Sequence, residues 1–162
     1  MPDIVDPEFG RLELRRGSWR GTVNIPMLGG DVPFEFDTLH LQPPQEAQRA
    51  CLSDFVQRCD QAFVCCIELE IFGYTQLLRR ERDLFGREKA ALDRIVQPAD
   101  IWKTIDDLSI LVFFDSEQPV DTLALRWTAE WEDEHGLQVP YRVGGDIRAS
   151  IQGDDYFENV PP

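Results

Sequence analysis

Apolar and polar residues alternate over the first forty residues, as they do in strands that bury one face. From residue 32 to 37, Val, Phe and Phe alternate with Pro, Glu and Asp. This period of two predicts a half-buried strand, and Pro33 indicates a sheet edge or a strand start. Weaker runs over 9–14 and 19–25 precede it, separated by turn-prone segments around Gly17 and Gly29. The N-terminal part therefore reads as strands.

The middle of the chain changes to a helical period. Ala47, Cys51, Phe55 and Cys59 recur every four residues and predict one helix, and Asp60 is placed to cap a second helix that runs to about residue 80. Over 67–71 apolar residues alternate with Glu, which is a strand pattern. We favour a helix there because good helix formers follow at 76–80.

Two further helices are expected before the chain returns to strands. The first runs from Arg87 to Val96, and Pro98 begins a short one that carries Trp102. The run 110–114 is apolar, 122–131 alternates, and 137–143 and 146–151 flank Gly144-Gly145, a two-residue hairpin signal. This order predicts an α+β domain, with an antiparallel sheet from both chain ends and a central helical hairpin packed on one face. We assign residues 1–152 to this single domain and 153–162 to an acidic mobile tail.

Charge narrows the classes of partner. The chain has 162 residues and a formal net charge of −14, and residues 100–162 hold 14 acidic and 4 basic side chains. A negative field of this size disfavours nucleic acid and anionic membranes and favours a cationic partner or plain solubility. Arg79, Arg80 and the basic residues up to Arg94 are interleaved with acids, which is more typical of a solvated helix end than of a nucleic-acid surface.

The four cysteines indicate a reducing compartment. Cys51, Cys59, Cys65 and Cys66 form no C-x-x-C pair and lie in apolar surroundings. On one helix Cys59 and Cys66 would be about 10 Å apart, too far for a disulfide. We read them as core thiols and expect a cytoplasmic protein, since the first residues lack the basic-then-apolar pattern of a signal peptide.

The densest chemistry lies in Trp131-Glu132-Asp133-Glu134-His135-Gly136-Leu137. One hypothesis is a metal-dependent hydrolase that uses Glu132, Glu134 and His135, although only a turn would bring them together, and zinc sites need three or four protein ligands. The other is a structural turn in which His135 bonds a carboxylate and Gly136 has a positive φ. We favour the turn and expect neither a metal nor another cofactor. The four tryptophans read mainly as core anchors, with Trp131 a candidate hot spot for protein binding.

This segment resembles a late W-D-x-E-H-G-L-G-like motif that marks a family of uncharacterised bacterial domains. Phe9-Gly10, Trp19-Arg20-Gly21 and Trp102 match other parts of that family's pattern. Glu132 stands where Asp is usual, and Gln138 where a second Gly is usual. The resemblance implies an α+β fold and an accessory role beside toxin genes, with immunity as the suspected activity.

These observations lead to one functional hypothesis and two alternatives. The chain is interpreted as a non-enzymatic, cytoplasmic binding protein, an immunity protein that neutralises a basic protein toxin. Trp131, Glu132, Asp133, Glu134 and His135 are the expected partner-binding residues, and charge reversal at the three acids should weaken binding far more than reversal at Glu68 and Glu70. The alternatives are the hydrolase and a generic acidic interaction module.

Overall fold

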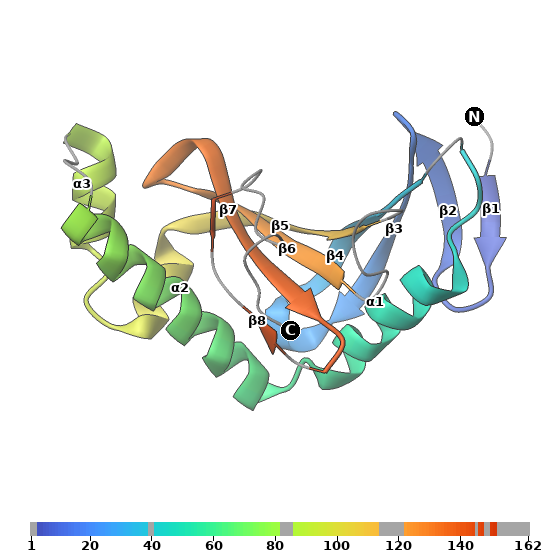
Figure 1. Ribbon diagram of the computed structural model, residues 1–162, viewed down its shortest axis with the longest axis horizontal. Helices are drawn as coiled ribbons and strands as arrows, with labels where there is room; N and C mark the ends of the chain where they lie inside the picture. The colour runs from blue at the N-terminus through green and yellow to red at the C-terminus, as the bar shows by residue number, and fades with distance from the viewer. Residues whose placement is uncertain are drawn as a thin grey trace.

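The computed structural model describes residues 3–38, 41–81, 86–113, 122–144, 146–147 and 150–151, which form one sheet and a set of helices (Figure 1). The strands are β1 Asp3–Asp6, β2 Gly10–Arg15, β3 Ser18–Ile25, β4 Gly30–Asp37, β5 Ile105–Val112, β6 Thr122–Ala129, β7 Glu132–Arg142, β8 Asp146–Ile147 and β9 Ser150–Ile151. The α-helices are α1 Glu46–Arg58, α2 Gln61–Glu81 and α3 Gly86–Asp93, and the 3-10 helices are η1 Pro26–Leu28 and η2 Pro98–Lys103. None of the helices in the described ranges is long and apolar enough to cross a membrane.

The sheet joins the two ends of the chain. Its strands follow the order β1 to β8, and β9 pairs with β7 beside β8. Every neighbouring pair is antiparallel except β4 and β5, which run parallel, with Phe34 opposite Ile110 and Phe36 opposite Val112. The helices α1, α2 and α3 lie in the connection between these two strands. The predicted α+β fold, with a sheet built from both chain ends, is confirmed, and the parallel pairing of β4 with β5 departs from the antiparallel pairing expected.

The alternating apolar and polar residues of β4 lie on opposite faces of the sheet, as predicted. Val32, Phe34 and Phe36 are at most 3 % exposed, while Asp31, Pro33 and Asp37 lie on the open face. Pro33 sits opposite Thr22 of β3, and the pairing with β5 begins one residue later. β4 is therefore an internal strand rather than an edge strand. Pro33 lies just before the segment that pairs with β5, so its missing N–H leaves no hydrogen bond to β5 unmade.

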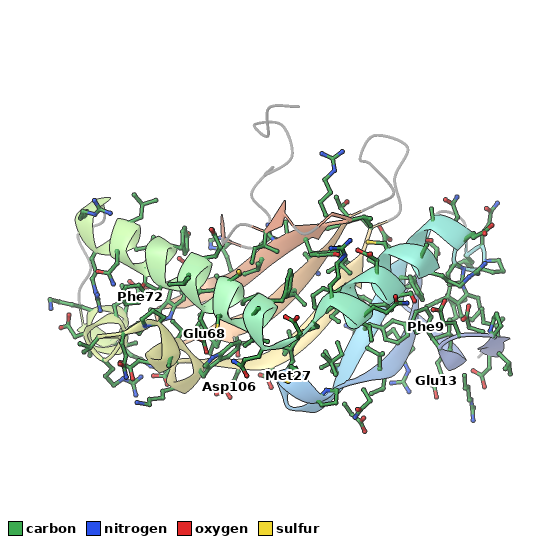
Figure 2. All side chains as sticks on the ribbon, turned by 90° about the horizontal axis from the view of Figure 1, so that it is seen from below. Phe9, Glu13, Met27, Glu68, Phe72 and Asp106 are labelled. Atoms are coloured by element: carbon green, nitrogen blue, oxygen red, sulfur yellow. The ribbon has the colours of Figure 1, made fainter. Side chains whose placement is uncertain are left out.

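The helices α1 and α2 cover one face of the sheet (Figure 2). The inward residues of α2 are Val64, Ile67, Ile71 and Leu78, spaced by three, four and seven. The Asp60 carboxylate accepts the Phe63 N–H at 2.9 Å, so the predicted cap is confirmed. The two helices diverge from their short link, so they span the sheet as two arms rather than packing side by side (Figure 1).

The cysteines are only partly in the core, which corrects the expectation. Cys51 and Cys59 are buried, whereas Cys65 and Cys66 are exposed, because the inward face of α2 passes through Val64 and Ile67. None of the four is in a disulfide. Burial, followed by the charge of Asp60, raises the pKa of the Cys59 thiol to about 11, so this thiol stays protonated.

Other boundaries also differ from the sequence expectations. The helix expected to reach Val96 ends at Asp93. β5 begins at Ile105 rather than 110, and β1, which the sequence analysis did not identify, adds an edge strand at 3–6. Arg142 pairs with Asp146, so three residues connect β7 to β8 instead of two. The acidic tail 153–162 lies outside the described residues.

Asp100 ties the end of α3 to η2. Its carboxylate accepts the N–H groups of Val96 and Gln97, both at 3.1 Å, and the Lys103 ammonium at 2.8 Å. The hydrogen bond from Lys103, together with these N–H groups, lowers the pKa of Asp100 to about 2. The anchored η2 holds Trp102, whose ring meets that of Trp127 edge-on at 6.3 Å.

We expect Asp100 to make stability pH-dependent. Because its pKa is lower in the folded chain than in the unfolded chain, its contribution is complete above about pH 4 and is lost as pH falls towards 2. The stability difference between the wild type and Asp100→Asn should therefore shrink over that interval, in urea unfolding measured from about pH 6 to pH 2. Lys103→Met should reproduce part of the effect. A difference that is constant with pH would contradict the prediction.

Gly21 is required by packing in the core. A Cβ there would lie 2.6 Å from the Phe34 ring and 2.8 Å from Leu12 Cδ2, and both neighbours are buried. We expect Gly21→Ala to lower the free energy of unfolding by about 1–3 kcal/mol through overcrowding. Thr22→Ala, at an exposed neighbour on the same strand, is the control and should change little. Equal urea midpoints for the two variants would refute this account of Gly21.

Candidate functional site: a pocket beside the β6–β7 turn

The turn between β6 and β7 is fixed to the rest of the domain by Thr104. The Glu130 N–H donates to the Thr104 carbonyl at 2.9 Å, and the Trp131 indole donates to the Thr104 hydroxyl at 3.3 Å. That hydroxyl donates in turn to the Ile101 carbonyl at 2.9 Å. Glu130 also forms an ion pair with Arg94, just after α3. The turn is therefore positioned by the end of η2 and by the residue that follows α3.

The start of β7 bulges out of register. Trp127 pairs with Leu137 and Ala129 with Glu132, so the single residue Thr128 on β6 faces the four residues 133–136 on β7. Gly136 has φ +74°, a conformation that other residues adopt only with strain. His135 Nδ1 lies 3.4 Å from Glu132 Oε1. The expected histidine–carboxylate contact and the expected positive φ are both present, but they lie in a bulge of strand β7 rather than in a turn.

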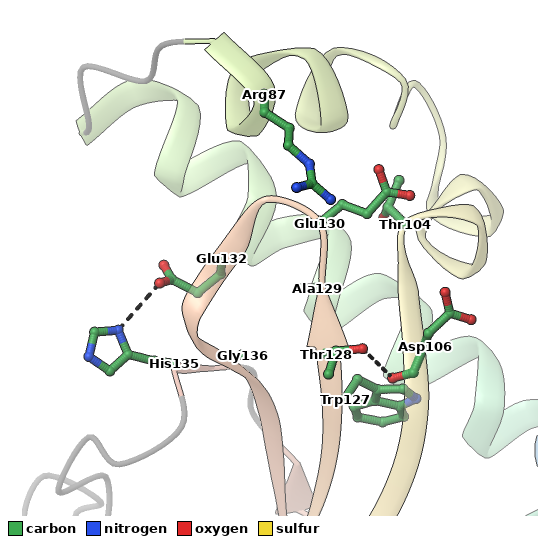
Figure 3. A pocket seen from close by; sticks show the side chains of 10 residues that line it. All are labelled: Arg87, Thr104, Asp106, Trp127, Thr128, Ala129, Glu130, Glu132, His135 and Gly136. Carbon is green, nitrogen blue, oxygen red and sulfur yellow. Dashed lines mark hydrogen bonds and ion pairs between the residues drawn. The ribbon is translucent and has the colours of Figure 1, made fainter.

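An open pocket of about 450 Å³ lies beside this bulge (Figure 3). Its walls come from the first turn of α3, the start of β5, the end of β6 and the start of β7. The charged or ionisable side chains in its lining are Arg87, Asp106, Glu130, Glu132 and His135. The Trp127 ring, Ala129 and Gly136 form its apolar part. Figure 3 shows Arg87 extending from α3 towards Glu130.

The carboxylates of the pocket differ in exposure. The Glu132 side chain is 7 % exposed and the His135 side chain beside it is 55 % exposed. Asp106 is exposed, and its backbone carbonyl accepts the Thr128 hydroxyl at 3.2 Å. Glu130 is partly exposed and has its partner in Arg94. Glu132 is thus the inner acid of the pocket and Asp106 the accessible one.

The five residues predicted from the sequence separate in space. Trp131 is 1 % exposed and packs on Tyr74 of α2, with ring centroids 6.1 Å apart. Its ring belongs to the core, as do those of Trp19 and Trp127, which confirms the core interpretation of these tryptophans. Glu132 and His135 meet at the pocket. Asp133 and Glu134 lie in β7, but their side chains are outside the described ones. The assignment of this set to partner binding stays a prediction.

The metal-dependent hydrolase with Glu132, Glu134 and His135 stays a hypothesis, because the side chain of Glu134 lies outside the described ones. The hydroxyl groups of the pocket, on Thr104 and Thr128, both donate to backbone carbonyls. Among the described residues, no three His, Cys, Asp or Glu side chains are grouped so that they could hold a metal ion. The Glu132–His135 contact alone supplies neither a nucleophile nor a ligand set.

The basic residues near α3 are dispersed rather than gathered into a patch. Arg79 donates to the carbonyls of Leu92 and Ile95, Lys89 pairs with Asp93, and Arg94 pairs with Glu130. The Arg79 bonds join α2 to the end of α3, the Lys89 pair lies within α3, and the Arg94 pair reaches the β6–β7 turn. Arg87, in contrast, lines the pocket.

Sequence reasoning missed Arg87, Asp106 and Glu130 as pocket residues. Each lies on a different element, and only the pairing of β5 with β6 and the position of α3 bring them to Glu132. The acidic excess of residues 100–162 is the sequence signal that could have pointed to Asp106 and Glu130.

Comparison with known protein families gives a match over most of the chain. The model of a domain of unknown function, DUF6985, matches residues 8–155. No curated protein and no solved structure matches the chain.

Proposed function

The chain belongs to the DUF6985 family of domains of unknown function, and from the site we propose that it is a non-enzymatic binding protein for a basic polypeptide. The pocket beside the β6–β7 turn is the proposed contact. It would accept a lysine or arginine side chain of the partner.

The pocket lining is the observation that carries this proposal. Asp106, Glu130 and Glu132 line it together with one arginine and the Trp127 ring. A cationic side chain there gains from the carboxylates, and its aliphatic stem gains from apolar wall contacts. Arg87 extends towards Glu130 and repels a cation there, so the incoming side chain would approach Asp106 and Glu132 instead.

The charge of the whole chain supports the same class of partner. A net charge of −14, concentrated in residues 100–162, accelerates encounter with a cationic protein and slows encounter with an anionic one. Within this class we propose a basic toxin made by the same bacterium, which the chain neutralises in the cytoplasm. The late Trp131–Leu137 motif and its resemblance to accessory domains beside toxin genes support that finer proposal.

Calorimetric titration with the product of the neighbouring gene tests the proposal. We expect binding that weakens steeply as salt is raised from about 0.05 M to about 0.5 M, because the attraction between opposite charges is screened. Chemical-shift changes should include the Trp127 indole. No binding at micromolar concentration would contradict the toxin proposal. Binding that is indifferent to salt would contradict the electrostatic mechanism.

A further inference from the structure

Arg87 places a positive charge in the pocket that has no partner within the described part of the chain. Its side chain is exposed, lines the pocket and extends towards Glu130 (Figure 3). Glu130, however, is already paired with Arg94, and among the described side chains Arg87 has neither an ion-pair nor a hydrogen-bond partner. The pocket therefore contains an arginine whose charge is not compensated by a direct contact.

The charges of the pocket come from separate walls. Arg87 belongs to the first turn of α3, whereas Asp106 belongs to β5 and Glu132 to β7, the strands on either side of β6. The pocket has a volume of about 450 Å³, within the range of cavities that hold small organic ligands, so it has room for more than one side chain. A partner that complements the whole pocket is positive beside the strands and negative beside α3.

A partner that carries only basic side chains fits this pocket poorly. A lysine or arginine that approaches Asp106 and Glu132 enters the same pocket as Arg87, and like charges brought together at an interface cost free energy. Arg87 also loses hydration when a partner covers it, and that cost is not offset while its charge has no partner. An acidic side chain of the partner placed against Arg87 removes both penalties, because a guanidinium group can donate two parallel hydrogen bonds to one carboxylate.

We propose that Arg87 is a specificity-determining residue, which selects a partner that presents an acidic side chain next to the basic one. This inference rests on the proposed function, since the basic side chain is the one that the pocket is proposed to accept. The net charge of −14 still favours encounter with a partner that is basic overall, while the acidic side chain fixes the orientation of the bound partner. Arg87 then disfavours basic polypeptides that lack the acidic side chain.

Synthetic hexapeptides of equal net charge test this inference at low salt. One kind has five lysines and one glutamate, and the glutamate is moved through all the positions of the peptide. The control kind has four lysines and two glutamines, so its net charge is the same. The NMR signal of the Trp127 indole reports binding, because this ring lines the pocket. We expect the wild type to bind at least one glutamate-containing peptide about fivefold more tightly than the controls, the gain from one exposed ion pair.

Arg87→Gln should abolish this preference, and Lys89→Gln should keep it. Lys89 is exposed on the same helix, pairs with Asp93 and does not line the pocket, so the two variants have equal net charge and differ only in where the charge is lost. If the wild type binds both kinds of peptide equally, or if the preference survives in Arg87→Gln, this inference is wrong and the proposed function stands. If neither kind binds the wild type at about 1 mM, the proposed function fails and this inference fails with it.

Discussion

Trp131→Ala is expected to lower the free energy of unfolding by about 3–5 kcal/mol. The indole is 1 % exposed, packs on Tyr74, and donates to the Thr104 hydroxyl at 3.3 Å. Removing it leaves a cavity between α2 and the sheet. The truncation also leaves the turn between β6 and β7 attached to Thr104 only through the Glu130 N–H. Urea unfolding followed by circular dichroism measures the loss.

Two controls separate packing from hydrogen bonding. Trp131→Phe keeps most of the ring volume and loses the N–H, so its cost should be smaller. Val96→Ala truncates a side chain that is 78 % exposed and should change stability little. If Trp131 were instead an exposed anchor for a partner, Trp131→Ala would abolish binding and leave the urea midpoint unchanged. That outcome would refute its placement in the core.

The second large effect concerns the pocket acids. The double variant Asp106→Asn with Glu132→Gln should weaken binding of the basic partner by about 100-fold, because it removes the accessible and the inner carboxylate while keeping side-chain size. Most of the difference in affinity between the wild type and the double variant should disappear at high salt. Glu130 is left unchanged because its ion pair with Arg94 fixes the turn. Calorimetry of the variant against the same partner measures the effect.

A matched control removes equal charge far from the pocket. Glu8 and Glu46 are exposed and lie near the first residues of β2 and α1. Glu8→Gln with Glu46→Gln should therefore cost only the small change that long-range attraction produces. Similar losses for the two double variants would mean that net charge alone directs binding. The pocket would then have no specific role.

The structure also changes the choice of residues for such tests. Glu68 accepts the Trp102 indole N–H at 2.6 Å, so reversing its charge would disturb the contact between α2 and η2. Glu68 is therefore unsuitable as the control residue for charge reversal that the sequence suggested. Glu132 is nearly buried beside His135, so reversal there would mix a loss of stability with a loss of binding. The substitutions Asp106→Asn and Glu132→Gln remove the charges but keep the size of the side chains. They therefore avoid both the loss of the contact at Glu68 and the burial of a reversed charge at residue 132.

The period of apolar residues correctly predicted the elements that bury one side and expose the other. The alternation at 32–37 and the helical spacing at 47–59 each record a single buried face, so β4 and α1 could be identified. The strand-like alternation at 67–71 misleads because α2 buries Ile67 and Ile71 on one side while Leu69 is exposed on the other. In a helix, two residues that are two positions apart lie about half a turn from each other, so Ile67 and Leu69 face opposite sides of α2.

The pocket could not be predicted in the same way. The contact between Glu132 and His135 and the positive φ of Gly136 are local, and their residue types indicated them. The rest depends on partners distant in sequence, such as Thr104 for Trp131 and Arg94 for Glu130. No local pattern encodes those pairings. A bulge at Asp106–Ser109, with Asp107 at φ +56°, further sets the register of β5 against β6.

The parallel pairing of β4 with β5 has a consequence for how the chain folds. The hairpins of β1 to β4 have partners close in sequence and can form as soon as they are synthesised, but β4 then ends the sheet with Phe34 and Phe36 on an incomplete edge. Its remaining neighbour arrives only after α1, α2 and α3 have been made. Closing so long a loop is entropically costly and slow, and an open apolar edge invites intermolecular pairing. The step that joins β5 to β4 is therefore the stage of biosynthesis at which this protein is most exposed to aggregation.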